Sequence, residues 1–281
     1  MKKNWKTGVA GFLTGLLIVM SSVANGQNEK TFTKKYLSKI PSVKASDKPA
    51  KYRMTAVYTN RDLYGNFMDK KKISGDYTRG LENGLVSWNN IFISSSSDFS
   101  KPFPSGSKQE YMENFKYVPS SGMLNTDAFK DFPKSPETVF AKNLVWDMMM
   151  IENFAWDYSD SLKINRTYII PEINGEFEMA DIGSYSHTSI QICWTGISQV
   201  NGKLCAVIEY RALDNKIELA MDQIKTKGTE QYWGTTWVAL NDKQIEYAEI
   251  YGGTIQEIEV TGMKNKFLVK TIRELWVEKI Q

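Results

Sequence analysis

The sequence predicts a mainly β protein of the α+β class: a curved antiparallel sheet or open barrel, with one long helix packed on its concave face. Short runs rich in aromatic and β-branched residues recur from Tyr52 onward, and turns containing Asn and Gly separate them. One convincing helical segment interrupts them at 136–154. Short connections favour antiparallel pairing, because parallel strands need long crossovers. A sheet with one apolar face needs cover, and this helix is apolar enough to supply it.

The first 26 residues have the order of a secretory signal peptide. Three lysines precede an apolar run at 9–20, and small residues at 24 and 26 prepare a cut before Gln27. The run is short for a stable membrane span, although an uncleaved N-terminal anchor would begin in the same way. We therefore expect a secreted or periplasmic protein that is cleaved near Gly26 and has no transmembrane span in its mature form.

The charge balance excludes some partners. The chain has 35 Lys+Arg and 32 Asp+Glu, and three of the lysines lie in the leader, so the remainder is neutral. A general nucleic-acid binder would need a clear cationic excess. One histidine and two separated cysteines cannot build a structural zinc site, and calcium loops and phosphate-binding glycine loops are absent from the sequence. We expect no nucleic-acid partner, no metal and no cofactor.

Composition divides the rest of the chain into a spacer and one domain. Residues 27–51 are polar and lysine-rich, which is typical of a flexible spacer; attraction to an acidic surface is the alternative. Residues 52–281 form a single β-rich domain. Within it, 95–135 is dense in Ser, Pro and Gly. About 40 residues with little regularity are unusual in a compact domain, so this segment is a surface excursion or a lid.

Strands are expected on both sides of the irregular segment and the helix. The first group lies within 52–94, with a turn at Asn83-Gly84. A meander fills 168–281, with turns that include Asn201-Gly202, Asp214-Asn215 and Gly252-Gly253. The expected strands are 52–59, 71–78, 85–94, 168–171, 175–181, 188–198, 203–212, 216–224, 230–240, 243–250, 254–260 and 266–279.

The helix begins with Ser135 as N-cap and Pro136 at its first position. A stripe at helical spacing faces the core: Phe140, Leu144, Met148, Ile151 and Ala155. Other apolar residues fall on the remaining faces, so a second surface must cover them: more sheet, the 95–135 segment or a ligand.

The two cysteines do not form a disulfide in the expected hairpin. With Asn201-Gly202 as its loop, Cys205 lies opposite Ser198, five residues from Cys193. That separation is roughly 16 Å along a strand, beyond the roughly 7 Å Cα limit for a bridge. Two buried free thiols are the prediction.

The titratable residues carry only a weak catalytic pattern. His187 enters a strand next to Ser186, whose side chain points to the opposite face, so a structural histidine is the interpretation. Asp147 and Glu152 lie about 140° apart around the helix and cannot converge. The alternative hypothesis, a secreted carbohydrate-active hydrolase, places its carboxylates in or near a loop beside Trp156 and Tyr158. Those carboxylates are Asp157, Asp160 and Glu172.

The leading hypothesis is a non-catalytic exported protein that binds an apolar, lipid-like ligand or a protein partner surface. Trp233 and Trp237 are spaced to share one sheet face, and with the helix they are expected to line an apolar cavity. The candidate ligand-binding residues are Val145, Trp146, Met149, Met150, Trp233 and Trp237.

The leader, the antiparallel meander and the apolar helix together resemble periplasmic lipoprotein-carrier-type proteins. They also resemble uncharacterised β-rich secreted bacterial proteins. The resemblance covers residues 52–281 in architecture, without a shared motif. It implies a strongly curved sheet that cups a helix and can shelter acyl chains.

Overall fold

The computed structural model describes residues 48–158, 161–170, 175–221 and 223–280. The expected signal peptide and nearly all of the expected spacer lie outside these residues. From residue 50 onward the chain forms strands, as predicted, around one long helix.

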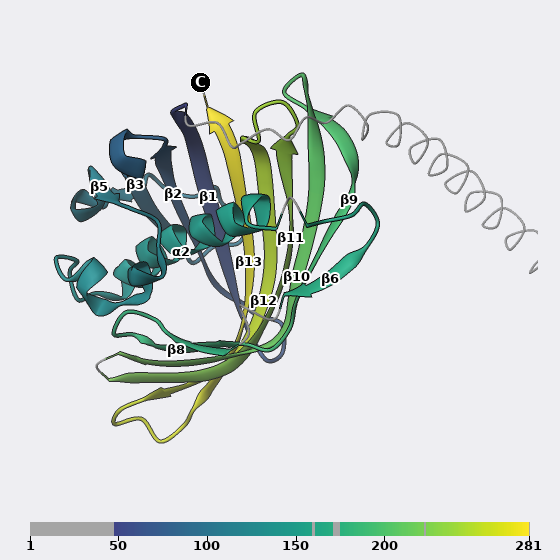
Figure 1. Ribbon diagram of the computed structural model, residues 1–281. Coiled ribbons are helices and arrows are strands. Elements are labelled where there is room, and N and C mark those ends of the chain that lie inside the picture. Colours follow the sequence, from purple (N-terminus) through teal and green to yellow (C-terminus); the bar gives the residue numbers. More distant parts are fainter. Residues whose placement is uncertain (1–47, 159–160, 171–174, 222, 281) are drawn as a thin grey trace, which may run out of the picture. The chain divides into compact units, whose positions relative to one another are not determined.

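All thirteen described strands belong to one antiparallel sheet that does not close into a barrel (Figure 1). The path through it is β4-β3-β2-β1-β13-β12-β11-β10-β8-β7; β5 pairs with β3, and β9 joins β6 to β10. The strands are β1 (Ala50–Asp62), β2 (Phe67–Arg79), β3 (Val86–Ser96), β4 (Ser107–Lys108), β5 (Phe115–Tyr117), β6 (Thr167–Ile170), β7 (Gly175–Glu178), β8 (Gly183–His187), β9 (Ile190–Val200), β10 (Lys203–Met221), β11 (Ile224–Ala239), β12 (Ile245–Val260) and β13 (Phe267–Ile280).

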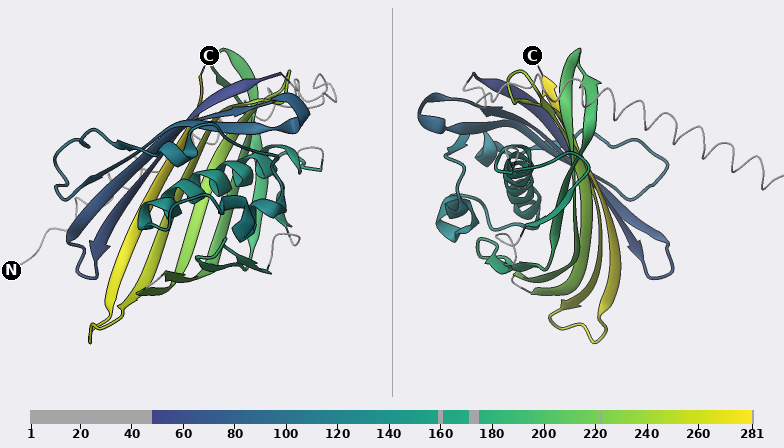
Figure 2. Two further views of the ribbon diagram at one scale, coloured as in Figure 1. Left: turned by 90° about the vertical axis from the view of Figure 1, so that its left-hand side faces the viewer. Right: turned by 45° about the vertical axis from the view of Figure 1, so that its right-hand side comes forward.

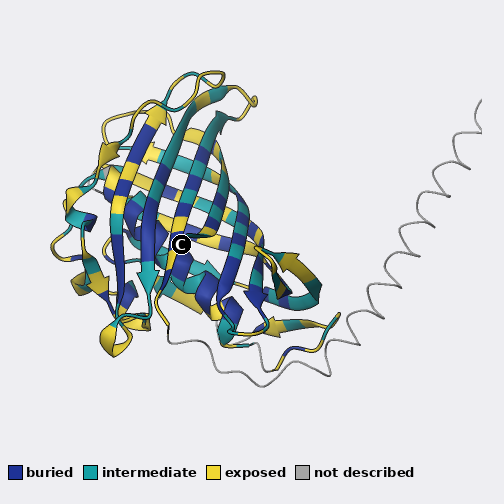
Figure 3. Ribbon diagram, turned by 90° about the horizontal axis from the view of Figure 1, so that it is seen from above, coloured by how far each residue is buried: buried dark blue, intermediate teal, exposed yellow. Residues whose placement is uncertain are grey.

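The first and last strands of the domain pair with each other. β1 runs antiparallel to β13 from Lys51↔Ile280 to Asp62↔Val269. Seen from above, buried and exposed residues alternate along neighbouring strands (Figure 3). The alternation arises because successive side chains of a strand point to opposite faces of the sheet.

Two expected turns are wrong, and both lie inside long strands. Asp214-Asn215 is a β-bulge within β10, where the register with β11 shifts between Ala212 and Asn215. Asp214 has a φ of 57°, which Asp tolerates better than most residues. Gly252-Gly253 lies in the middle of β12, in register with both neighbouring strands. Bulges and glycines bend strands as well as end them, and here the strands continue through the curved sheet.

The helix α2 (Pro136–Trp156) lies against the concave face of the sheet (Figure 2). Phe154 packs on Tyr210 of β10, with ring centroids 4.3 Å apart. That phenol lies over Gly234 of β11, where an added Cβ would come within 2.6 Å of its oxygen. Four residues of the predicted stripe, from Leu144 to Ala155, are fully buried, and Phe140 is partly buried. The predicted helix and its core-facing stripe are confirmed.

The Ser/Pro-rich segment packs against the helix. Besides β4 and β5 it forms four-residue or shorter 3₁₀ turns, η2 (Glu110–Met112), η3 (Ser121–Leu124) and η4 (Thr126–Phe129). Met123 and Phe129 are buried, and Phe129 meets Trp146 of α2 edge-to-face at 5.8 Å. Trp146 Nε1 donates a hydrogen bond to the Met123 carbonyl at 2.9 Å. The protein's own chain thus covers the second face of the helix. The remaining described 3₁₀ element is η1 (Glu82–Gly84), at the predicted Asn-Gly position.

Candidate functional site

The convex face of the sheet carries a patch of five aromatic side chains. Strand register defines three neighbouring rows across it: Trp237 beside Tyr247, Trp276 in the next row, and Trp233 beside Tyr251 in the third. The Trp237 and Tyr247 rings are 5.2 Å apart, and the Trp233 and Tyr251 rings stack at 6.2 Å with their planes 25° apart. We call these five residues the outer aromatic patch.

Trp233 is the most unusual member of the patch, because 49% of its surface is exposed. Ile272 and Ile255 extend the exposed apolar surface along β13 and β12. The long helix lies on the other side of the sheet (Figure 2). A group of exposed apolar side chains on one face is typical of an interaction site, whereas a single exposed side chain is ordinary.

Carboxylates are interleaved with the aromatic rings. The row that contains Trp276 also contains Glu209 and Glu249, while Glu274 and Glu278 lie in the other two rows on β13. The rows continue onto β1, where Arg53 is the cross-strand neighbour of Glu278 but forms its ion pair with Asp76. Glu249 accepts hydrogen bonds from the Tyr247 and Tyr251 hydroxyls at 3.4 and 3.2 Å. Burial, and then the negative charge of Glu249, raise the pKa of Tyr247 to about 12.

These four carboxylates have no ion-pair partner among the described residues. The nearby cation on β10, Arg211, donates instead to the side-chain oxygen of Gln191 at 2.8 Å. The outer aromatic patch therefore combines one exposed and four half-buried rings with carboxylates that form no ion pair among the described residues.

The six residues predicted to bind a ligand lie on opposite faces of the sheet. Tyr210 faces the helix, and its cross-strand partner Gly234 shares that face. Trp233 alternates with Gly234 and so points away from the helix, and Trp237 points the same way. The expected cavity between the helix and this pair of tryptophans is therefore wrong, although the two tryptophans do share one face as predicted.

The four helical candidates pack within the protein. Val145 is fully buried, and the other three, Trp146, Met149 and Met150, are partly buried against the core. The 95–135 segment supplies part of that cover. No ligand is needed to explain the apolar circumference of the helix.

Polar residues occupy part of the concave face, beside the apolar contact with α2. In one row across the sheet, Tyr58, Arg273, Gly252 and Tyr232 follow each other on β1, β13, β12 and β11. The next row contains Glu230 opposite Asn215. We call the following eight residues the inner polar cluster: Tyr58, Asp147, Tyr185, His187, Asn215, Glu230, Tyr232 and Arg273.

An ion pair connects the helix to this cluster. Asp147 of α2 accepts a hydrogen bond from Arg273 Nη2 at 2.8 Å, and both side chains are largely buried. Burial raises the pKa of Asp147 to about 6, although the Arg273 charge acts in the opposite direction. The Tyr185 hydroxyl donates to Glu230 at 2.5 Å. Burial also lowers the pKa of His187 to about 4, so the imidazole is neutral at pH 7.

The two carboxylates of the helix, Asp147 and Glu152, belong to separate networks. Asp147 pairs with Arg273, whereas Glu152 accepts a hydrogen bond from Tyr77 at 2.8 Å and lies 3.6 Å from Arg79. The prediction that Asp147 and Glu152 cannot converge is confirmed. Asp157 is the C-cap of α2, while Asp160 and Glu172 lie outside the described residues.

The thiols lie as predicted. Cys205 is opposite Ser198, and both cysteines are free. A register shift lies between Val207 and Ile208, beside Gly196. Cys205 is buried as predicted, which raises its pKa to about 11. Cys193 is predicted to be buried too, but it is only half-buried.

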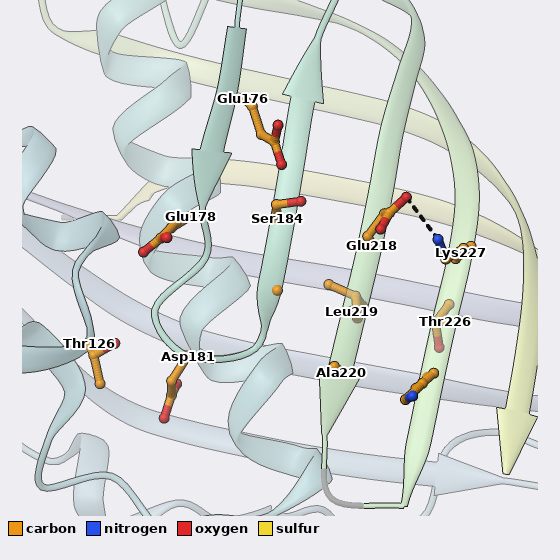
Figure 4. Close-up of a pocket in the computed structure, with 12 residues that line it drawn as sticks. Thr126, Glu176, Glu178, Asp181, Ser184, Glu218, Leu219, Ala220, Thr226 and Lys227 are labelled. Atoms are coloured by element: carbon orange, nitrogen blue, oxygen red, sulfur yellow. Dashed lines mark hydrogen bonds and ion pairs between the residues drawn. The ribbon is translucent and has the colours of Figure 1, made fainter. Parts of the chain in front are cut away.

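Two surface hollows lie at the β10 side of the sheet. The larger, of about 500 Å³, is open and charged (Figure 4). Glu176, Glu178 and Asp181 line it, and Glu218 forms an ion pair with Lys227 across it at 3.3 Å. The smaller, of about 370 Å³, lies around Arg211 and Asp214. Among the described residues, no group of His, Cys, Asp and Glu could hold a metal ion.

Comparison with known proteins adds a structural likeness. No family model matches the chain, and no curated protein matches it. A solved structure that describes lipid–protein interactions in lipovitellin is similar over 83% of this chain, with 12% identity and a TM-score of 0.45. This chain covers 25% of that longer chain. Within the part of the chain that the structure describes, no helix has both the length and the hydropathy that a membrane crossing requires.

Proposed function

We propose that this protein is an exported binding protein that docks a basic protein partner on its outer aromatic patch. The observation that carries the proposal is Trp233, half-exposed and stacked on Tyr251 among carboxylates that have no ion-pair partner. Trp and Tyr are the residue types that dominate binding energy at protein interfaces.

The charge of the patch favours a partner segment that carries lysine or arginine. Glu209, Glu274 and Glu278 form no ion pair with described side chains, so an approaching cation gains Coulomb energy without displacing an existing partner. A cation over the face of an aromatic ring gains a further 0.5–1 kcal/mol or so at an exposed site. An anionic partner would meet repulsion at the same positions.

The geometry gives less support to the other two hypotheses. An apolar ligand would need the apolar helix residues to face open space, and Val145 is fully buried while Trp146 packs on Phe129. A hydrolase would need a pair of carboxylates in one pocket. Of the three predicted carboxylates, Asp157 is the C-cap of α2, and Asp160 and Glu172 lie outside the described residues.

Titration with hexalysine tests this proposal, with hexaglutamate as the charge-reversed control. We expect saturable binding of hexalysine alone, measured by tryptophan fluorescence or calorimetry and weakened by salt because surface charges are screened. Trp233→Ala should raise Kd by roughly threefold to tenfold. Glu274→Gln should also weaken binding.

Two matched variants serve as controls. Tyr64→Ala removes an aromatic ring that is 90% exposed at the β1–β2 turn, and Glu82→Gln removes an exposed carboxylate in η1. Neither should change the affinity for hexalysine. The proposal would be contradicted if hexaglutamate bound as tightly as hexalysine. It would also be contradicted if Trp233→Ala and Tyr64→Ala changed the Kd for hexalysine equally.

A further inference from the structure

We infer that the inner polar cluster is a second binding site, for a small uncharged molecule with several adjacent hydroxyl groups. This site is on the opposite side of the sheet from the outer aromatic patch, and the inference does not depend on the patch.

The first reason is an accumulation of buried polar atoms without hydrogen-bond partners. Asp147 Oδ2, Arg273 Nε and the Tyr232 hydroxyl are buried and make no hydrogen bond within the described structure. Asp147 is 6% exposed and Tyr232 is 3% exposed. Buried polar groups are almost always paired in native proteins, so several unpaired ones in one place indicate a missing partner.

The second reason is that donors and acceptors are mixed. Asp147 Oδ2 is an acceptor, Arg273 Nε is a donor, and the Tyr232 hydroxyl can act as either. A hydroxyl group also donates and accepts, so a molecule with adjacent hydroxyls can satisfy all three atoms. A ligand that only donates or only accepts cannot do so.

The third reason is electrostatic. Arg273 and Asp147 already neutralise each other at 2.8 Å. The Glu230 carboxylate accepts the Tyr185 hydroxyl, and it also lies over Gly252, since an added Cβ there would be 3.7 Å from Oε1. An anionic ligand would be repelled by Glu230, and a cationic one would be repelled by Arg273. An uncharged ligand meets neither penalty.

The fourth reason is the aromatic wall beside these atoms. The His187 ring meets Tyr185 at 4.8 Å, Phe177 at 5.7 Å and Tyr232 at 6.1 Å. Tyr185, His187 and Glu230 are only half-buried, so the wall has contact with solvent. Rings beside hydroxyl-binding groups suit a compact carbon skeleton whose C–H bonds pack on their faces.

The surrounding fold holds this wall close to the helix. Lys142 of α2 donates hydrogen bonds to the Ala180 carbonyl at 2.9 Å and to Asp181 at 2.8 Å, in the turn between β7 and β8. Gly183 begins β8 with a φ of 141°, and an added Cβ would lie 2.0 Å from the Glu218 carbonyl oxygen. Only glycine allows β8 to approach β10 this closely, which positions Tyr185 and His187.

Calorimetric titration of the mature protein with myo-inositol and D-glucose tests the inference, with cyclohexanol as the control that has one hydroxyl. We expect saturable binding of at least one polyhydroxylated compound and none of cyclohexanol. Tyr232→Phe removes one hydroxyl and should weaken that binding about threefold to tenfold.

Tyr52→Phe is the matched control, because the Tyr52 hydroxyl is also buried and unpaired but lies outside the cluster. It should leave the affinity unchanged, and circular dichroism should show both variants folded. Absence of saturable binding by either compound, or equal effects of the two substitutions, would overturn the inference. Trp233→Ala should not change the binding of these hydroxyl compounds, because Trp233 lies on the opposite face of the sheet. The two proposals can therefore fail independently.

Discussion

At the scale of single residues, Glu152 makes stability depend on pH. Burial raises its pKa from the ordinary 4.5 to about 7, against the opposing effects of Arg79 and the Tyr77 hydroxyl. The folded protein therefore binds more protons than the unfolded chain between these values. This contribution to stability is fully present below about pH 4.5 and is lost as the pH rises through 7.

Glu152→Gln should remove this dependence. We expect the variant to gain about 2 kcal/mol in unfolding free energy, relative to the wild type, between pH 5 and pH 8. Urea unfolding at both pH values measures the difference, and other titrating groups cancel in the comparison. A gap between variant and wild type that is the same at both pH values would disprove this account of Glu152.

Gly234 shows how one residue permits the contact between sheet and helix. An added Cβ would lie 2.4 Å from the Glu249 carbonyl oxygen and 2.6 Å from the Tyr210 hydroxyl. Gly234→Ala should destabilise the protein by about 1–3 kcal/mol through overpacking. Gly253→Ala is the control, since an added Cβ there meets no atom within 4 Å. Equal midpoints of thermal unfolding in the two variants would argue against this packing.

At the scale of elements, the 95–135 segment is held to the helix by Trp146 and the groups around it. Trp146→Ala removes the hydrogen bond to the Met123 carbonyl and the ring contact with Phe129. We expect faster limited proteolysis within 121–130, while Trp233→Ala, on the other side of the sheet, should leave the cleavage rate unchanged. Unchanged cleavage in both variants would mean that the segment is held elsewhere.

Local sequence patterns predicted which helices and strands form, but they predicted the lengths of these elements less well. The helix stripe and the Asn201-Gly202 hairpin could be read directly, because both depend on nearest neighbours along the chain. Asp214-Asn215 and Gly252-Gly253 are residue types that favour turns. Gly252-Gly253 nevertheless stays in β12, because that strand pairs with β11 and β13 at this position. Asp214-Asn215 stays in β10, because the strand pairs with β11 before and after the bulge. Pairing between distant strands is not visible in a local pattern.

At the scale of the whole molecule, the sequence could not show which face of the sheet the helix covers. The two-residue spacing of Trp233 and Trp237 placed them together, yet nothing local showed that Gly234 and Tyr210, rather than the tryptophans, meet α2. For the same reason the sequence did not reveal the inner polar cluster. Its members come from 58 to 273 and converge only through strand register.

Export is a further prediction at this scale. We expect cleavage near Gly26 and a mature protein that begins near Gln27, recovered from the periplasm or the medium. Intact mass spectrometry of the recovered protein measures this. A mass that retains residues 1–26, with the protein in the membrane fraction, would contradict export in soluble form.

The most direct test of the central claim is to map the hexalysine contact on the folded protein by NMR chemical-shift perturbation. If the outer aromatic patch is the docking surface, the shifts will concentrate on its three rows, at Trp233, Tyr251 and Trp276, and the Trp233 and Trp237 indole N–H signals will move during titration. Shifts centred on Glu176 and Glu178 in the open charged hollow would contradict the claim, because they would show that the peptide follows negative charge alone.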